Sequence, residues 1–400
     1  MSSRRANVAA VLKPGREKSL LRHHPWVFSG AVARVEGAPA SGETVAVRSA
    51  EGRFLAWGAF SPASQIRVRV WSFAEAEPID AGFFRARAER AVALRQELGV
   101  PAASDAWRVV NGESDGLPGV VADRYGDTLV LQLSSAGAEA WRDAIGDALT
   151  AATGCATVYE RSDLDVRELE GLTPRAGALR GAAPAPITIR EHGLRFRVDV
   201  RSGQKTGFFL DQRDNRARVG ALAGGRRVLN GFCYTGGFTL AALAGGAASV
   251  LSVDSSAEAL ALARENVELN GFDAARCAFR QGDMFQLLRG LHRAGERFDI
   301  VVLDPPKFAP TAASAQRAAR GYKDINLNAF RLLAPGGLLA TFSCSAGVDD
   351  DLFQKIVAGA AADAGVDAAI VGRFTAAPDH PVSLAFPEGA YLKGLLCRKD

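Results

Sequence analysis

The sequence has few cysteines and places them far apart. Its five cysteines include no Cys-x-x-Cys pair, and none lies in a cluster with histidines. This excludes a disulfide-rich scaffold and a zinc-finger type of site, because both need closely spaced or paired thiols. We therefore expect a cytosolic protein with reduced thiols and no metal ion. The cysteines are Cys155, Cys233, Cys277, Cys344 and Cys397.

The sequence also lacks a secretory segment and an unbroken membrane span. Two arginines near the N-terminus are followed by only seven uncharged residues before Lys13, which is too short for a signal sequence. One stretch from Val228 to Val253 carries no charge, but five glycines and several polar residues divide it. We expect a buried strand, loop, helix and strand here, and no membrane span.

What is present is the composition of a globular protein with an uneven charge. The 400 residues are 48% hydrophobic and 23% charged, which suits two or three domains. The net charge is +4, yet residues 1–73 hold eleven Lys and Arg against four Glu, a balance of +7. A basic appendage on a slightly acidic body predicts nucleic-acid binding, although a solvated basic surface would have the same charge.

The basic segment has the pattern of a small all-β domain. Between residues 11 and 73, short apolar stretches alternate with Gly, Pro and Ser turns. Within 66–70, apolar residues alternate with Arg67 and Arg69, which predicts a strand with a basic outer face. We expect Arg67, Arg69 and three further cations to contact RNA phosphates. The three are Arg16, Lys18 and Arg22.

The middle of the chain has the pattern of a compact α+β domain. Helical spacing covers 81–98 and 138–152, while 107–133 and 156–163 are typical of strands joined by Gly and Asp turns. The segment 173–189 is rich in Pro, Gly and Ala and predicts a loop or linker.

The remainder alternates short apolar strands with helices. Strands are expected at 226–230, 249–254, 297–304 and 337–343, and residues 255–258 (Ser-Ser-Ala-Glu) are expected to form a capping box for a helix. This alternation predicts a parallel sheet covered on both faces, which is an α/β Rossmann-like arrangement. Such sheets bind ligands at the carboxyl ends of their strands.

A glycine-rich loop follows the first of these strands. Residues 230–238 read NGFCYTGGF, with glycines at 231, 236 and 237 that would let the backbone pass close to a ligand. The spacing differs from the G-x-G-x-x-G of dinucleotide sites, which disfavours NAD and FAD. The glycine spacing is compatible with a cofactor that has no phosphates.

Two acids are placed to complete a nucleoside site. Asp254 ends the second strand, where a carboxylate can accept both hydroxyls of a ribose; a helix cap is the alternative. Asp283 follows an expected third strand and could face an adenine amino group. Its alternative is a solvated turn.

The fourth and fifth strands end in residues suited to chemistry. Asp304 precedes Pro305 and Pro306, which fix the turn and hold the carboxylate over the sheet edge. Cys344 ends the next strand, and Lys307 is a candidate cation for stabilising its thiolate. An acid and a thiolate together suit C5 methylation of a pyrimidine, with the thiolate adding to C6. If the cysteine is a bystander, Asp-Pro-Pro suits methylation of an exocyclic amine instead.

Several sequence blocks together resemble the RlmI family of bacterial large-subunit (23S) ribosomal RNA cytosine-C5 methyltransferases. The similarity extends in order over essentially the whole chain. The blocks are GREKSLLRHHPWVFSGAV (15–32), NGESDGLPGVVADRYGD (111–127), KTGFFLDQRDNR (205–216), LNGFCYTGGF (229–238), DPPKF (304–308), GYKDIN (321–326), FSCS (342–345) and DHPV…PEGAYLKG (379–394).

The resemblance implies three domains and a mechanism. They are a PUA RNA-binding domain at 1–75, a central α+β domain at 80–185 and an S-adenosylmethionine-dependent methyltransferase domain at 186–400. Cys344 would be the nucleophile and Asp304 the acid that grips the base, with large-subunit ribosomal RNA as partner and Lys307 among the RNA contacts. The S-adenosylmethionine site would comprise Asn230, Gly231, Phe232, Tyr234, Thr235, Gly236, Gly237, Asp254, Asp283, Asp304 and Gln212.

Some alternatives stay open at this point. Many related RNA enzymes have a second cysteine after Asp-Pro-Pro, where this chain has Lys307, so the group that removes the C5 proton is unassigned. Methylation of another RNA atom and a non-catalytic RNA-binding role are the competing functions. The oligomeric state is also open, with a homodimer as one option.

Overall fold

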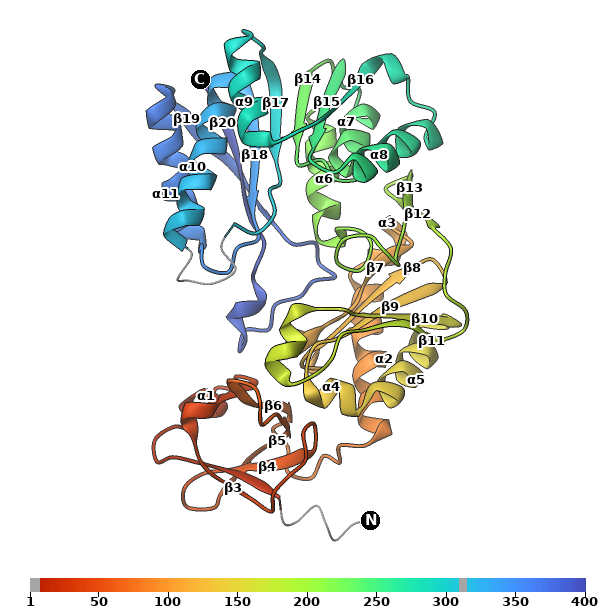
Figure 1. Cartoon of the computed structure of the whole chain (residues 1–400), viewed down its shortest axis with the longest axis vertical. Coiled ribbons are helices and arrows are strands. Elements are labelled where there is room, and N and C mark those ends of the chain that lie inside the picture. Colours follow the sequence, from red (N-terminus) through yellow and green to blue (C-terminus); the bar gives the residue numbers. More distant parts are fainter. Residues whose placement is uncertain (1–7, 309–314) are drawn as a thin grey trace. The chain divides into compact units, whose positions relative to one another are not determined.

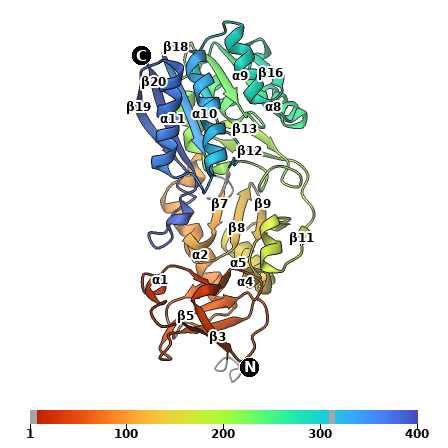
Figure 2. The same ribbon diagram turned by 60° about the vertical axis from the view of Figure 1, so that its left-hand side comes forward.

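The computed structural model describes residues 8–308 and 315–400 (Figures 1 and 2). Contacts between residues divide the chain into two compact units. The first comprises the chain up to Ile189 together with Val198–Leu210 and Pro378–Gly389. The second comprises Arg190–Arg197, Asp211–Ala377 and Ala390–Asp400. Two short strands, β12 (Ile187–Glu191) and β13 (Leu194–Val198), pair as a two-stranded sheet. The division between the two units falls within these strands in the sequence.

The N-terminal part of the first unit is built on a six-stranded sheet, as the alternating pattern predicted. Its strand order is β2-β6-β5-β4-β1-β3, with β1 and β4 parallel and the other neighbours antiparallel. A four-residue helix, α1 (Lys18–Leu21), interrupts the all-β pattern. The strands are β1 (Ala9–Leu12), β2 (Trp26–Phe28), β3 (Val32–Glu36), β4 (Thr44–Arg48), β5 (Phe54–Phe60) and β6 (Ile66–Ser72).

The expected basic outer face of β6 is wrong for Arg69. Its side chain is only 10% exposed, and Nη2 lies 3.0 Å from Oε1 of the buried Glu170. Its guanidinium also lies over the ring of Trp26. β6 lies between β2 and β5, and every residue of the strand from Val68 to Ser72 is buried, so an alternating cation need not point to water. Arg67 is half-buried and donates hydrogen bonds to the carbonyl oxygens of Ser61 and Pro62.

The rest of the first unit contains a five-stranded sheet in the order β11-β10-β9-β8-β7. Apolar residues of the helices α2 and α5 share one core with its strands, which confirms the expected α+β arrangement. The helix expected at 138–152 breaks at Trp141 into two. The elements are α2 (Ala81–Glu97), α3 (Val100–Ala103), β7 (Ala106–Asn111), β8 (Val120–Tyr125), β9 (Thr128–Leu133), α4 (Ala136–Ala140), α5 (Arg142–Thr153), β10 (Thr157–Ser162) and β11 (Arg175–Arg180).

Strand β11 corrects the expected linker. Residues 175–180 pair antiparallel with β10 at the edge of the sheet. Backbone pairing, the packing of Leu179 on the core, and a 2.8 Å contact between Arg180 and Asp147 hold the strand. A Gly- and Ala-rich edge strand lacks the apolar alternation from which strands are recognised.

The second unit contains a seven-stranded sheet in the order β16-β15-β14-β17-β18-β20-β19. The first five strands are parallel, as predicted, whereas β20 runs antiparallel to both β18 and β19. The strands are β14 (Arg227–Gly231), β15 (Ser249–Asp254), β16 (Cys277–Gln281), β17 (Phe298–Leu303), β18 (Leu333–Ser343), β19 (Ala368–Thr375) and β20 (Lys393–Lys399).

Helices cover both faces of this sheet, as the strand–helix alternation predicted (Figure 1). Residues of α9, α10 and α11 form one core with one set of strand side chains, while α6, α7 and α8 pack on one another and on the other face. The helices are α6 (Arg213–Ala221), α7 (Gly237–Ala244), α8 (Ala257–Leu269), α9 (Met284–Arg293), α10 (Ala315–Leu332) and α11 (Asp350–Ala364).

The predicted capping box at 255–258 is wrong, because the residue three positions after the capping serine is Ala259 and not a glutamate. Ser256, rather than Ser255, caps α8, and its hydroxyl accepts a hydrogen bond from the backbone N–H of Ala259. The helix ends as expected at Asn270, followed by Gly271 in the left-handed conformation. Across the described ranges of the chain, no helix is long and apolar enough to cross a membrane.

Candidate functional site

The predicted motifs meet at one edge of the seven-stranded sheet. Gly231 at the end of β14 pairs with Val253 of β15 on one side and with Leu303 of β17 on the other. Leu303 in turn pairs with Thr341 of β18. The segments that leave these four strands therefore start side by side, at the carboxyl edge where parallel sheets bind ligands.

The loop between β14 and α7 has two strained residues, and two of its glycines are closely packed. Phe232 and Tyr234 have φ angles of 59° and 48°, a region that costs a residue with a side chain about 1–2 kcal/mol. Gly231 and Gly237 do not have positive φ. A Cβ on Gly231 would come within 2.6 Å of Met284, and one on Gly237 within 2.8 Å of the Arg216 side chain. A side chain at either position would therefore require its neighbour to move.

Asp254 ties the glycine loop to the end of β15. Its Oδ2 accepts a hydrogen bond from the backbone N–H of Tyr234 at 2.8 Å, and its Oδ1 accepts one from Ser256 N–H at 2.9 Å. The helix cap is Ser256, so Asp254 holds the two segments together without capping α8. Each carboxylate oxygen has a second lone pair with which it can accept a ligand hydroxyl.

Three further predicted residues are buried with polar atoms that lack a partner among the described residues. They are Oδ1 of Asn230, Oγ1 of Thr235 and Nε2 of Gln212. The other amide atoms are occupied: Asn230 donates to Thr239 at 2.9 Å, and Gln212 accepts from Asn215 at 2.6 Å. Buried polar groups without partners are uncommon in folded proteins. Asn230 and Thr235 lie on the loop segment itself, so their atoms without partners fit a polar ligand such as S-adenosylmethionine.

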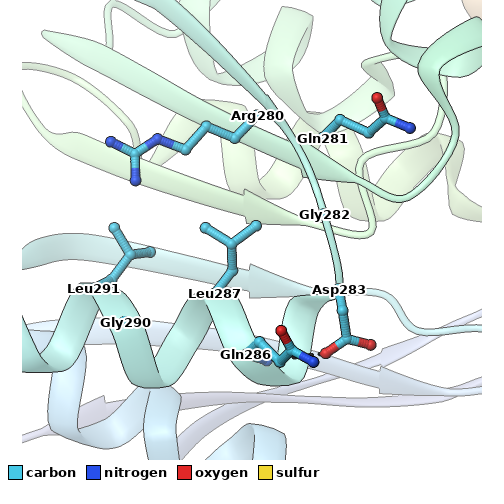
Figure 3. Close-up of a pocket in the computed structure, with 8 residues that line it drawn as sticks. All are labelled: Arg280, Gln281, Gly282, Asp283, Gln286, Leu287, Gly290 and Leu291. Atoms are coloured by element: carbon cyan, nitrogen blue, oxygen red, sulfur yellow. Dashed lines mark hydrogen bonds between the residues drawn. The ribbon is translucent and has the colours of Figure 1, made fainter.

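Asp283 lies one strand further out and caps a helix. It follows β16, as expected, and its Oδ1 accepts from the backbone N–H of Gln286 at 2.9 Å. Figure 3 shows it on the rim of an open hollow of about 430 Å³ between the end of β16 and α9. Leu287 and Leu291 form the apolar side of this hollow. Asp283 is the one predicted cofactor residue among those that line this hollow. The centre of the hollow therefore lies to one side of the glycine loop.

The Asp-Pro-Pro-Lys-Phe segment leaves β17 next to an aromatic cluster. Asp304 is half-buried and Lys307 is exposed. Phe308 lies 4.8 Å from the ring of Tyr322 and 6.5 Å from the ring of Phe232, measured between centroids. The cluster therefore connects the segment after Asp304 with the glycine loop.

Cys344 is partly exposed and sits between two tethered serines. The hydroxyl of buried Tyr322 accepts a hydrogen bond from Ser343 Oγ at 3.0 Å and shares another with Ser345 Oγ at 2.9 Å. Burial raises the pKa of Tyr322, so this hydroxyl keeps its proton. The network holds the backbone on both sides of the cysteine.

A cation near Cys344 was missed from the sequence. Lys393, at the start of β20, pairs with Ser343, and its ammonium donates to the carbonyl oxygens of Ser345 at 3.0 Å and Val348 at 2.6 Å. A negative charge on Cys344 would raise the pKa of Lys393. Sequence reasoning assigned this role to Lys307. The antiparallel return of β20 brings Lys393 there, and no spacing rule for parallel strands could reveal it.

The predicted RNA contacts lie in the first unit, except for Lys307. Arg16, Lys18 and Arg22 are all exposed around α1. Phe28 is 50% exposed and Leu21 is 56% exposed in the same part of the chain. Within 8–308 and 315–400, no three His, Cys, Asp or Glu side chains are grouped so that they could hold a metal ion.

Comparisons with known proteins agree with this geometry. The family of S-adenosylmethionine-dependent methyltransferases matches residues 171–398, and the PUA-like domain family matches residues 10–73. The ribosomal RNA large subunit methyltransferase I of Salmonella arizonae is 51% identical over 389 residues, covering 97% of this chain and 96% of that protein. The protein of the same name from Escherichia coli K12 is 51% identical over 393 residues, covering 98% and 99%.

Solved structures share the fold at lower identity. A Streptococcus mutans protein described as a SAM-dependent methyltransferase has a TM-score of 0.84 at 23% identity, covering 98% of this chain and all of that one. A methyltransferase structure complexed with SAH has a TM-score of 0.86 at 23% identity, with the same coverage.

Proposed function

Because this chain belongs to the ribosomal RNA large subunit methyltransferase I family, and is thus an S-adenosylmethionine-dependent methyltransferase, we propose that it methylates C5 of a cytosine in 23S ribosomal RNA. The observation that carries the proposal is the position of Cys344. It is a partly exposed thiol directly after the carboxyl end of β18, next to the strand that Asp304 follows. A cytoplasmic location follows from this substrate.

In the proposed reaction the Cys344 thiolate attacks C6 of the cytosine and forms an S–C6 bond. The electron pair of the C5–C6 double bond moves to C5, while Asp304 stabilises a proton on N3. Bound S-adenosylmethionine supplies the electrophilic methyl group that C5 takes. A base then removes the C5 proton, and the S–C6 bond breaks to restore the double bond and the thiolate.

The cofactor would be held at the carboxyl edge of β14, β15 and β16. Asp254 would accept the ribose hydroxyls, and Asp283 would face the adenine from the outer strand. The buried polar atoms of Asn230 and Thr235 that lack partners support a polar ligand here, and Gln212 would be a further contact. Phe232, Tyr234 and the loop glycines would form the wall of the site, with Asp304 at its inner end.

The proposed domain division assigns RNA binding to the N-terminal part. Residues 1–75 would form the RNA-binding domain, 80–185 the central domain and 186–400 the catalytic domain. Arg16, Lys18 and Arg22 are exposed cations on the first, and Lys307 is an exposed cation beside Asp304. These four side chains would contact the RNA backbone.

The test is covalent capture with RNA that contains 5-fluorocytosine at the target position. Fluorine cannot leave C5 as a cation, so the enzyme should remain attached to the RNA through Cys344 after denaturation. Methylation of a guanine amine or ring nitrogen predicts no adduct. Absence of an adduct in protein that binds S-adenosylmethionine and RNA would contradict cytosine-C5 methylation.

A further inference from the structure

Both residues that flank Cys344 are held by one tyrosine. The Tyr322 hydroxyl binds the side chains of Ser343 and Ser345 and is fully buried in α10. Ser345 N–H also donates to Ser343 Oγ at 3.3 Å. The backbone on either side of Cys344 therefore has little freedom.

A buried lysine holds the same segment from the neighbouring strand. Lys393 is 5% exposed, and its ammonium donates to the carbonyl oxygens of Ser345 and Val348 in the turn after Cys344. Burial lowers the pKa of Lys393, whereas the negative charges of Asp350, Cys344 and Asp349 act in the opposite direction. Since such coupling is mutual, a protonated Lys393 favours a negative Cys344.

We infer that Tyr322 and Lys393 form a clasp that positions Cys344 and stabilises its thiolate, the form that the proposed function would use. Tyr322 fixes the backbone through the two serines, and Lys393 fixes the following turn and supplies positive charge. Both are positioning residues, because they act on Cys344 and not on the base. The inference rests on the proposed function in one respect, namely the identity of the group that the thiolate attacks.

The chain provides a matched control on the same strand. Lys399, at the other end of β20, also donates to two carbonyl oxygens, those of Phe330 at 3.2 Å and Leu333 at 2.9 Å. Burial likewise lowers its pKa. Lys399 pairs with Ala368 at the start of β19, whereas Lys393 pairs with Thr375 at the end of β19 and with Ser343 next to Cys344. Lys399 therefore lies at the edge of the sheet opposite to Cys344.

The experiment measures how fast iodoacetamide modifies Cys344 in the full-length protein between pH 6 and 9.5, resolved by peptide mass spectrometry. In the wild type, the rate should reach half its maximum below about pH 8.5, the pKa of a free thiol. Lys393→Met should lower the rate at pH 7 about tenfold or more, and Lys393→Arg should restore most of it. Lys399→Met should leave the profile of Cys344 unchanged.

Tyr322→Phe tests the other half of the clasp. It removes only the hydroxyl oxygen, so the thiolate charge should be retained, while looser positioning of Cys344 should slow formation of the 5-fluorocytosine adduct about tenfold. An unchanged alkylation profile in Lys393→Met would overturn the role of Lys393. A wild-type midpoint at or above about pH 8.5 would also overturn it, and this measurement does not depend on the folding of any variant. Adduct formation at the wild-type rate in Tyr322→Phe would overturn the role of Tyr322. Absence of an adduct in the wild type, with the alkylation results as expected, contradicts the proposed reaction alone.

Discussion

At the scale of single residues, Cys344 differs from the other four thiols in its surroundings. Cys155, Cys233 and Cys397 are buried, and Cys277 lies on the far edge strand β16. Burial raises the pKa of Cys397 to about 11 and raises that of Cys233 further. Neither forms a useful amount of thiolate at neutral pH, whereas Cys344 is partly exposed beside Lys393.

Replacement of this thiol gives the most direct prediction. Cys344→Ala should reduce methyl transfer to below about one hundredth of wild type, a barrier increase of about 2.7 kcal/mol or more, while S-adenosylmethionine affinity stays unchanged. Single-turnover methylation and calorimetry measure the two effects. Cys277→Ala, which changes the other half-exposed thiol, is the control and should remain active. A Cys344→Ala protein with a tenth of wild-type activity would contradict the nucleophile assignment.

Asp254 is the second residue with a sharp prediction. Asp254→Ala removes the acceptor proposed for the ribose hydroxyls and also leaves the backbone N–H groups of Tyr234 and Ser256 without their partner. The loss of charge-assisted hydrogen bonds worth roughly 1.5–3 kcal/mol should weaken S-adenosylmethionine binding roughly 10- to 150-fold. Calorimetry measures the affinity, with thermal melting to verify folding. Equal affinity in a folded variant would exclude Asp254 from the site.

At the scale of elements, the sequence was informative where apolar runs decide the structure. The parallel strands β14, β15, β17 and β18 are buried runs, and they carry the motifs at the predicted ends. The edge strand β11 was missed because pairing rather than apolar alternation defines it. Arg69 was misplaced because local alternation cannot reveal that distant Glu170 covers its face. Lys393 was missed as a partner of Cys344 because β20 returns antiparallel.

Helix α1 and the residues on either side of it provide a test at this scale. Gln substitutions of Arg16, Lys18 and Arg22 together should weaken binding to 23S ribosomal RNA fragments. If all three neutralise phosphates of single-stranded RNA, the slope of log affinity against log salt should become shallower by about 2. Filter binding at several salt concentrations measures the slope. The control changes two exposed cations elsewhere in the same domain, Arg34 on β3 and Arg53 just before β5, and should alter the slope less.

At the scale of the whole molecule, the first unit is made of segments that are distant in sequence. Residues 198–210 and 378–389 cluster with the N-terminal half of the chain. Buried polar contacts hold them there. Arg95 pairs with Asp115 through contacts of 2.6 and 2.8 Å and donates to the Asp379 carbonyl at 2.8 Å. The hydroxyl of Tyr125 forms a 2.8 Å hydrogen bond with that of Thr206.

Arg95 is the residue on which this arrangement depends most, because it is completely buried and connects three segments. Arg95→Ala would leave the Asp115 carboxylate buried without its cation, which should lower the free energy of unfolding by about 3–5 kcal/mol. Urea titrations followed by near-UV circular dichroism measure the loss. Segment 378–389 should also become sensitive to proteases, since its contact with Arg95 is removed.

The exposed pair of Arg34 and Glu36 supplies the contrast. These side chains are 61% and 44% exposed, so Arg34→Ala should change the free energy of unfolding by less than about 1 kcal/mol. Combining Arg95→Met with Asp115→Asn should recover part of the Arg95→Ala loss, because no unpaired charge then remains in the interior. If Arg95→Ala is no more destabilising than Arg34→Ala, the buried pair does not hold segment 378–389 in the first unit.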